Sequence, residues 1–117
     1  MIKFVSDNEY GNLPGEHYSL LDKENEEVCK FGLVKQWEGC ARAYFDFTSH
    51  SNSVAIARGI KRLLKERNPY YARIEATVRC DSEVDQRFAT WLGFVTEGTM
   101  EGYDPVDHTS HLLMRYN

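Results

Sequence analysis

The sequence predicts an α+β fold in which a mixed, mostly antiparallel sheet carries two helices. The strongest observation is the stretch 72–94, where the pattern of a strand is followed by a short helix, a glycine stop and another apolar run. A second observation is a set of three strand-like segments between residues 18 and 48, separated by charged or glycine-containing turns. A third is an amphipathic segment from Val54 onward with helical spacing.

Length and composition limit the class of protein. With 117 residues, 42% of them hydrophobic and 13% aromatic, the chain is expected to form one domain, 1–117, with a packed core. The net charge of -4 argues against nucleic acid as a partner. We find no apolar run near the roughly 20 residues that span a membrane, and no signal-peptide pattern. The three cysteines are odd in number and lack metal-type spacing, which favours reduced thiols in a cytoplasmic protein.

The first half of the chain has the pattern of a β-meander. Residues 1–5 are expected to form a short edge strand, and the Asn-, Gly- and Pro-containing residues 6–16 a loop. Three strands are then expected at 18–21, 28–34 and 41–48, each pairing antiparallel with the one before it.

Two helices are expected in the second half. From Val54, the residues Ile56, Ile60, Leu63 and Leu64 form an apolar face, and Asn68-Pro69 stops the helix. The remaining face is basic, and we favour a solvated surface over a patch for an acidic partner.

The strand at 72–80 leads directly into the second helix. Asp81 or Ser82 supplies the N-cap, and Gly93 ends the helix in a left-handed conformation. The helical spacing places Val84, Phe88, Trp91 and Leu92 toward the core. Strands at 95–103 and 111–116 then form a closing hairpin.

This order of elements, together with two motifs, resembles a known family. The strand Arg-Ile-Glu-Ala-Thr-Val at 73–78 and the helix end Arg-Phe-Ala-Thr-Trp-Leu-Gly-Phe at 87–94 are similar to those of the GNAT (acyl-CoA N-acyltransferase) superfamily. Residues 37–44, followed by Thr48-Ser49, resemble the third and fourth strands of small GNAT-like proteins of tailed phages and prophages. The resemblance covers roughly residues 18–116 and implies a GNAT-like fold that lacks the usual first two helices. It also implies either an open acceptor cleft or a homodimer partner that walls it.

For the cofactor, the resemblance implies acetyl-CoA. Its pantetheine arm is expected along the fourth strand, and its diphosphate at the start of the following helix. The usual glycine-rich loop is replaced by a hydroxyl-rich one, so N-capping by Ser51 or Ser53 alone remains an alternative. The expected cofactor-binding residues are Phe45, Phe47, Thr48, Ser49, Ser51, Asn52, Ser53 and Val54.

For catalysis, the resemblance implies a base for the amine and an acid for the thiolate. Asp46 or Glu75 is expected to act as base through water, with solvent-facing or salt-bridged carboxylates as the simpler reading. The tyrosine that many relatives carry in the second helix is Ala89 here. Cys80 and Ser82, or Tyr103, are the expected substitutes.

One histidine-containing turn has residue types that could bind a metal ion. The segment Asp-His-Thr-Ser-His at 107–111 places two histidines three residues apart beside an aspartate. Because the two rings are expected to point to opposite faces, we favour a surface turn and predict no metal site.

The sequence therefore predicts an acetyl-CoA-dependent N-acetyltransferase-like protein that transfers an acetyl group to an amine, with a protein as one acceptor considered. The alternative is a catalytically inactive GNAT-fold phage protein that serves as a virion component or inhibits a host protein. In either case the expected location is the host cytoplasm or the virion. Neither nucleic acid nor a membrane is expected as a partner.

Overall fold

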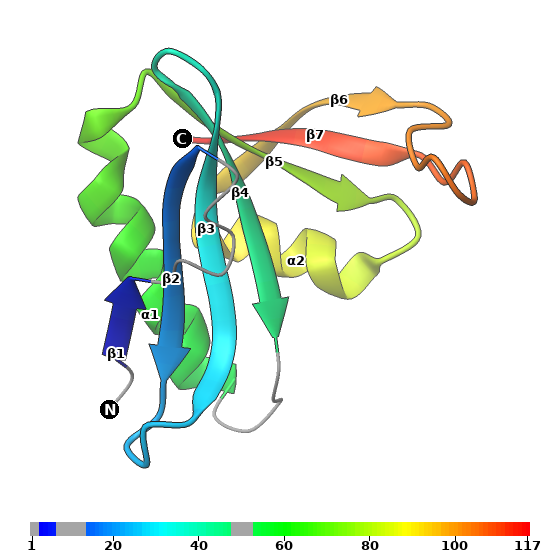
Figure 1. The fold of residues 1–117 in the computed structure, drawn as a ribbon. Helices are drawn as coiled ribbons and strands as arrows, with labels where there is room; N and C mark the ends of the chain where they lie inside the picture. Colours follow the sequence, from blue (N-terminus) through cyan, green and yellow to red (C-terminus); the bar gives the residue numbers. More distant parts are fainter. Residues whose placement is uncertain (1–2, 7–13, 48–52) are drawn as a thin grey trace.

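The computed structural model describes residues 3–6, 14–47 and 53–117, with the backbone alone for 3–6, 47 and 53. Seven strands form one sheet in the order β1-β2-β3-β4-β5-β7-β6 (Figure 1). The elements are β1 (Lys3–Ser6), β2 (Gly15–Leu21), β3 (Glu27–Trp37), β4 (Cys40–Phe47), α1 (Ser53–Arg67), the 3₁₀ turn η1 (Asn68–Tyr70), β5 (Arg73–Arg79), α2 (Glu83–Leu92), β6 (Phe94–Met100) and β7 (His111–Tyr116). The predicted α+β class, with its mixed and mostly antiparallel sheet and two helices, is confirmed.

The meander is longer than the apolar runs that predicted it. β3 pairs antiparallel with both β2 and β4, and its pairing with β4 continues through Lys35 and Trp37 at the hairpin. Polar residues extend these strands because backbone hydrogen bonds do not depend on the side chain. At the tip of this hairpin Gly39 has a φ of 82°, a conformation that glycine adopts without steric cost.

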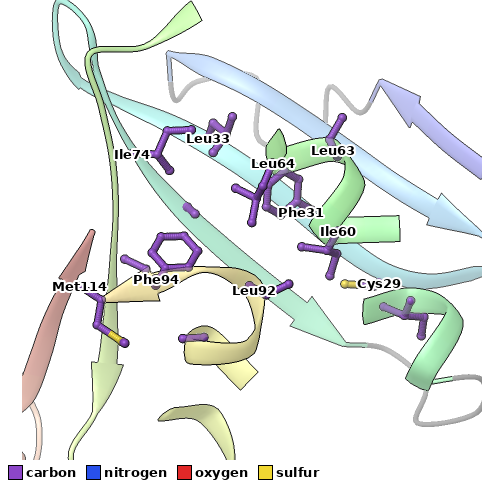
Figure 2. Packing of buried hydrophobic residues seen from close by; sticks show 14 of the residues in the cluster. Cys29, Phe31, Leu33, Ile60, Leu63, Leu64, Ile74, Leu92, Phe94 and Met114 are labelled. Atoms are coloured by element: carbon purple, nitrogen blue, oxygen red, sulfur yellow. The ribbon is translucent and has the colours of Figure 1, made fainter. Parts of the chain in front are cut away.

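Both helices cover the same face of the sheet (Figure 1). Ile56, Ile60 and Leu64 of α1 are fully buried, as the helical spacing predicted. They pack with Phe31 of β3 and with the apolar side chains that α2 and β6 contribute, as Figure 2 shows. Among the described residues, no helix has both the length and the apolar character that crossing a membrane requires.

The ends of α2 are as predicted, but fewer of its residues face the core than the helical spacing predicted. The Ser82 hydroxyl accepts a hydrogen bond from the Asp85 amide, and Gly93 ends the helix with a φ of 117°. Val84 and Trp91, expected in the core, are 76% and 45% exposed, so that prediction was wrong. The reason is that Ala89 and Leu92 are the residues that fill the contact with the sheet.

The exposed Trp91 instead meets the first helix. The ammonium group of Lys61 lies 4.2 Å from the centroid of its indole ring, in a cation–π contact between α1 and α2. This contact leaves the other face of α2 free to border the space between β4 and β5.

Candidate active site

The central pair of strands in the sheet separates partway along its length. β4 and β5 are parallel and pair only at Cys40–Arg73, Ala41–Ile74 and Arg42–Glu75. At the near end, the Gly39 carbonyl accepts hydrogen bonds from the amides of Ala72 and Arg73, at 2.8 and 3.0 Å. Beyond Arg42 and Glu75 the strands diverge (Figure 1), and β4 stays paired with β3 while β5 stays paired with β7. The facing edges of both strands are therefore left without a strand partner.

A cleft of about 430 Å³ occupies this divergence. Helix α2 borders it with Phe88 and with the small side chain of Ala89, while the ring of Phe45 stands edge-on to Phe88 at 5.8 Å between centroids. Much of the lining is apolar, and its polar side chains come from β3, β4, β5, β7 and the first turn of α2. The lining residues are Val34, Gln36, Arg42, Ala43, Tyr44, Phe45, Ala76, Thr77, Val78, Arg79, Asp85, Phe88, Ala89 and His111.

A buried carboxylate marks the point where the strands part. Glu75 is 3% exposed and accepts hydrogen bonds from Arg42 Nη2 at 2.7 Å and from Arg73 Nε at 2.9 Å. Burial alone would raise the pKa of Glu75, but the hydrogen bonds from Arg73 and Arg42 outweigh it and lower the pKa below its ordinary value. Glu75 is thus held ionised between two arginines, which fixes the fork of the cleft and makes it a weak proton acceptor.

The connection between β6 and β7 lies over the far end of β5. Arg79 donates to the carboxylates of Asp81, Asp104 and Asp107, the last at 2.7 Å. Hydrogen bonds from the Arg79 side chain, and from the backbone and side chain of Thr109, lower the pKa of Asp107. Asp107 is therefore engaged by an arginine, and among the described residues no cluster of three His, Cys, Asp or Glu side chains is arranged to hold a metal ion.

Tyr103, from the same connection, reaches back to the fork. Its hydroxyl accepts a hydrogen bond from Arg42 Nη1 at 3.0 Å. Its ring lies against the imidazole of His111, with 5.1 Å between the ring centroids. Tyr103 thus links the fork of the cleft to the first residue of β7.

Besides Tyr103, four acid–base candidates were expected, and the structure does not bring these four together. Asp46 is exposed on β4 and is absent from the cleft lining, and Glu75 is committed to its two arginines. Cys80 is a free, half-buried thiol just past β5, also outside the lining. Ser82 serves as the N-cap of α2, with its Oγ 3.3 Å from the Asp85 amide. Of the four, only Glu75 touches the cleft region, through Arg42.

The expected cofactor residues fall partly within the described chain. Phe45 lines the cleft, and its role toward a cofactor stays a prediction. Val54 is 63% exposed in the first turn of α1, and Ser53 begins that helix. The side chain of Phe47, and all of Thr48, Ser49, Ser51 and Asn52, lie outside the described residues. The diphosphate position at the start of α1 therefore stays a prediction.

His111 is a cleft residue that the sequence analysis placed where the turn 107–111 enters the last strand, with a surface position expected for that turn. It is half-buried at the start of β7, opposite Arg79 in the pairing with β5. Both ring nitrogens are buried, and neither has a hydrogen-bond partner among the described residues. The apolar run that follows His111 was the available signal for its position in the sheet. A residue that begins an interior strand pairs with the strands on both sides and does not lie in the exposed turn.

Comparison with solved structures identifies the architecture. A mutant spermidine N-acetyltransferase from Vibrio cholerae matches with a TM-score of 0.76 at 14% identity, over 86% of this chain and 63% of that one. Ribosomal-protein-S5-alanine acetyltransferase from Vibrio fischeri matches with a TM-score of 0.74 at 16% identity, over 92% and 63%. A Bordetella pertussis protein assigned to the GNAT family of acetyltransferases matches with 0.72 at 21%, over 94% and 68%.

The chain has the GNAT fold. It spans about 63% of the length of the first two of these structures. No protein-family model matches the sequence, and no curated protein matches it either. The predicted GNAT-like architecture is confirmed by structure, while the expected phage or prophage origin stays a prediction.

Proposed function

We propose that this protein is an N-acyltransferase that moves an acetyl group from acetyl-CoA to an amine. The observation that carries the proposal is the cleft that opens where β4 separates from β5. In a GNAT fold this is the position expected for the pantetheine arm of the donor. The structural neighbours named as spermidine and ribosomal-protein-alanine acetyltransferases support the same class of reaction, since both names specify transfer to an amine.

The residues of the cleft fit a thioester donor. Beyond Arg42, the free edge of β4 offers backbone N–H and C=O groups to the amides of the pantetheine arm, as an added strand would. Ala43, Ala76 and Ala89 leave room along this edge, and Phe45 and Phe88 give an apolar wall for the arm. When bound, the donor supplies an activated carbonyl. The cleft holds that carbonyl in place and excludes water from it.

A group of polar side chains beside the cleft suits the acceptor. Arg42, Tyr103 and His111 lie where the fork, the β6–β7 connection and β7 meet. An amine that enters past these side chains would meet polar groups first, and the carbonyl of the donor between the strands.

A thermal-melting experiment tests donor binding. Acetyl-CoA at 100 to 1,000 times its dissociation constant is expected to stabilise the wild type by about 3 to 4 kcal/mol. Thr77→Trp places a bulky ring in the cleft lining and should abolish this shift. Thr99→Trp, on an exposed position of the edge strand β6, should leave the shift intact. No shift in the wild type, or an unchanged shift in the Thr77 variant, would contradict the placement of the donor.

An assay of thiol release tests turnover. We expect free CoA to appear only when an amine is supplied, with a polyamine and a peptide with a free N-terminus as the first two acceptors. The acetylated acceptor should be found by mass spectrometry. Donor binding without transfer to any amine would favour the alternative of an inactive GNAT-fold protein.

A further inference from the structure

The buried imidazole of His111 is unexplained by the packing of the fold. Both its nitrogens are shielded from solvent, yet neither is hydrogen-bonded to any described residue. Leaving one buried polar group unpaired costs about 1 to 3 kcal/mol, so such groups are rare in native proteins. A ring that the fold tolerates in this state, on the wall of a cleft, is a candidate for a role toward a ligand.

The other titratable side chains that line the cleft are already engaged or lie at its rim. Arg42 and Arg79 are bound to carboxylates, and the Tyr44 hydroxyl meets His17 Nδ1 at 2.8 Å. Asp85 lies exposed in the first turn of α2. Of the described lining residues, His111 is therefore the base that is both enclosed and unpaired.

Residues of β5, of β6 and of the connection between β6 and β7 surround His111. Arg79 of β5 stands opposite it in register, and residues directly opposite in a sheet share a face. Met100 of β6 pairs with it on the other side and is uncharged. Tyr103 covers its ring, and the hydroxyl of that tyrosine is held by Arg42. The acidic groups on these sides are Asp104 and Asp107, which accept hydrogen bonds from Arg79, and Asp85 of α2, which lines the same cleft.

We propose that His111 is the general base of the acyl transfer, an inference that rests on the proposed function. As the acceptor nitrogen bonds to the thioester carbonyl carbon, the imidazole takes the proton that this nitrogen loses. The carbon–sulfur bond then breaks, and the imidazolium returns the proton to the departing thiolate. Imidazole suits this exchange because histidine changes its charge near neutral pH. Tyr103 lies over the ring, and an entering acceptor must displace it to reach the nitrogens.

The test compares His111→Gln with His108→Gln, a matched change at an exposed histidine three residues earlier. Both variants should still show the acetyl-CoA melting shift, and their dissociation constants for acetyl-CoA should stay within twofold of the wild-type value. His111→Gln should lower kcat/KM by about 10²- to 10⁴-fold and remove the acidic limb of the pH profile. His108→Gln should match the wild type. Full activity and an unchanged pH profile in the His111 variant would overturn the proposal while leaving the proposed function standing.

A second measurement covers the case in which His111→Gln does not fold. In histidine-labelled wild type, the His111 ring signals should shift when a donor analogue and an amine are both bound, and those of His108 should not. Unmoved His111 signals in that ternary complex would also overturn the proposal. Failure of the wild type to bind acetyl-CoA would instead remove the proposed function, and this role of His111 with it.

Discussion

At the scale of one residue, the position that the strand pattern gives Glu75 differs from the position it has in the structure. By alternation it belongs to the polar face of β5, yet it is almost fully buried. Burying a carboxylate is costly unless it is paired, and here Arg42 and Arg73 both donate to it. The residue therefore joins β4 to β5 at the point where they begin to diverge.

Replacing the Glu75 carboxylate should lower the stability of the fold in a pH-dependent way. Glu75→Gln leaves two arginines without their shared partner and should cost about 3 kcal/mol near pH 7. Because the folded pKa of Glu75 is lowered, its contribution is complete above the unfolded value of about 4.3 and is lost as pH falls through the lower folded pKa. In denaturant unfolding measured from pH 7 to pH 2.5, the free energies of unfolding of wild type and variant should thus become more similar as the pH falls.

The control for this experiment is a carboxylate at the surface. Glu38→Gln breaks the ion pair with Lys35 on a side chain that is 94% exposed, and no measurable change is expected. A difference between wild type and Glu75→Gln that stays constant down to pH 2.5 would contradict the role of the ionised carboxylate.

At the scale of elements, α2 decides the shape of the cleft. Its cap Ser82 fixes where the helix starts, and Phe88 and Ala89 then meet the divergence of β4 and β5. The sequence also makes Ser82 a candidate proton donor in catalysis, and the two roles predict different results.

A serine that serves only as a cap should affect stability alone. Ser82→Ala is expected to lower the free energy of unfolding by about 1 kcal/mol, because the Asp85 amide loses its acceptor. In the thiol-release assay, kcat should remain within twofold of the wild type. Thr90→Ala, on an exposed position of the same helix, is the control and should change neither quantity by as much. A loss of kcat beyond tenfold at unchanged stability would restore Ser82 as a catalytic candidate.

The elements could be predicted because their signals are local. Alternation in β5, the cap at Ser82 and the left-handed Gly93 all act within a few residues, and each was found where expected. The exposure of Val84 and Trp91 was not predictable in this way, because a short helix with apolar residues on two sides is oriented by its tertiary neighbours.

The positions of the cleft residues depend on contacts between segments that are still farther apart in the sequence. His111 approaches β5 only because the β6–β7 connection folds back and is anchored at Arg79. A turn of Asp, His, Thr and Ser contains no sign of that anchoring. The cleft could therefore be predicted at the level of β4, which contributes Phe45 to its lining, but not at the level of its titratable groups. The cofactor position at the start of the following helix stays a prediction.

At the scale of the whole molecule, the sheet is built as two antiparallel halves joined by one short parallel contact. β1 to β4 form one half, and β5, β7 and β6 the other. The two halves are held together at Arg42 and Glu75 and covered by both helices on one face. This arrangement leaves an open edge in the middle of the sheet, and under the proposed function the donor would pair with that edge as an added strand.

Amide hydrogen exchange with and without acetyl-CoA tests this account most directly. If the donor pairs with the open edge, amides of β4 beyond Arg42 should exchange at least tenfold more slowly at saturating acetyl-CoA. Amides of the outer edge strand β6 should be unchanged. Saturating binding that protects another surface, or that leaves β4 beyond Arg42 as exposed as before, would contradict the account.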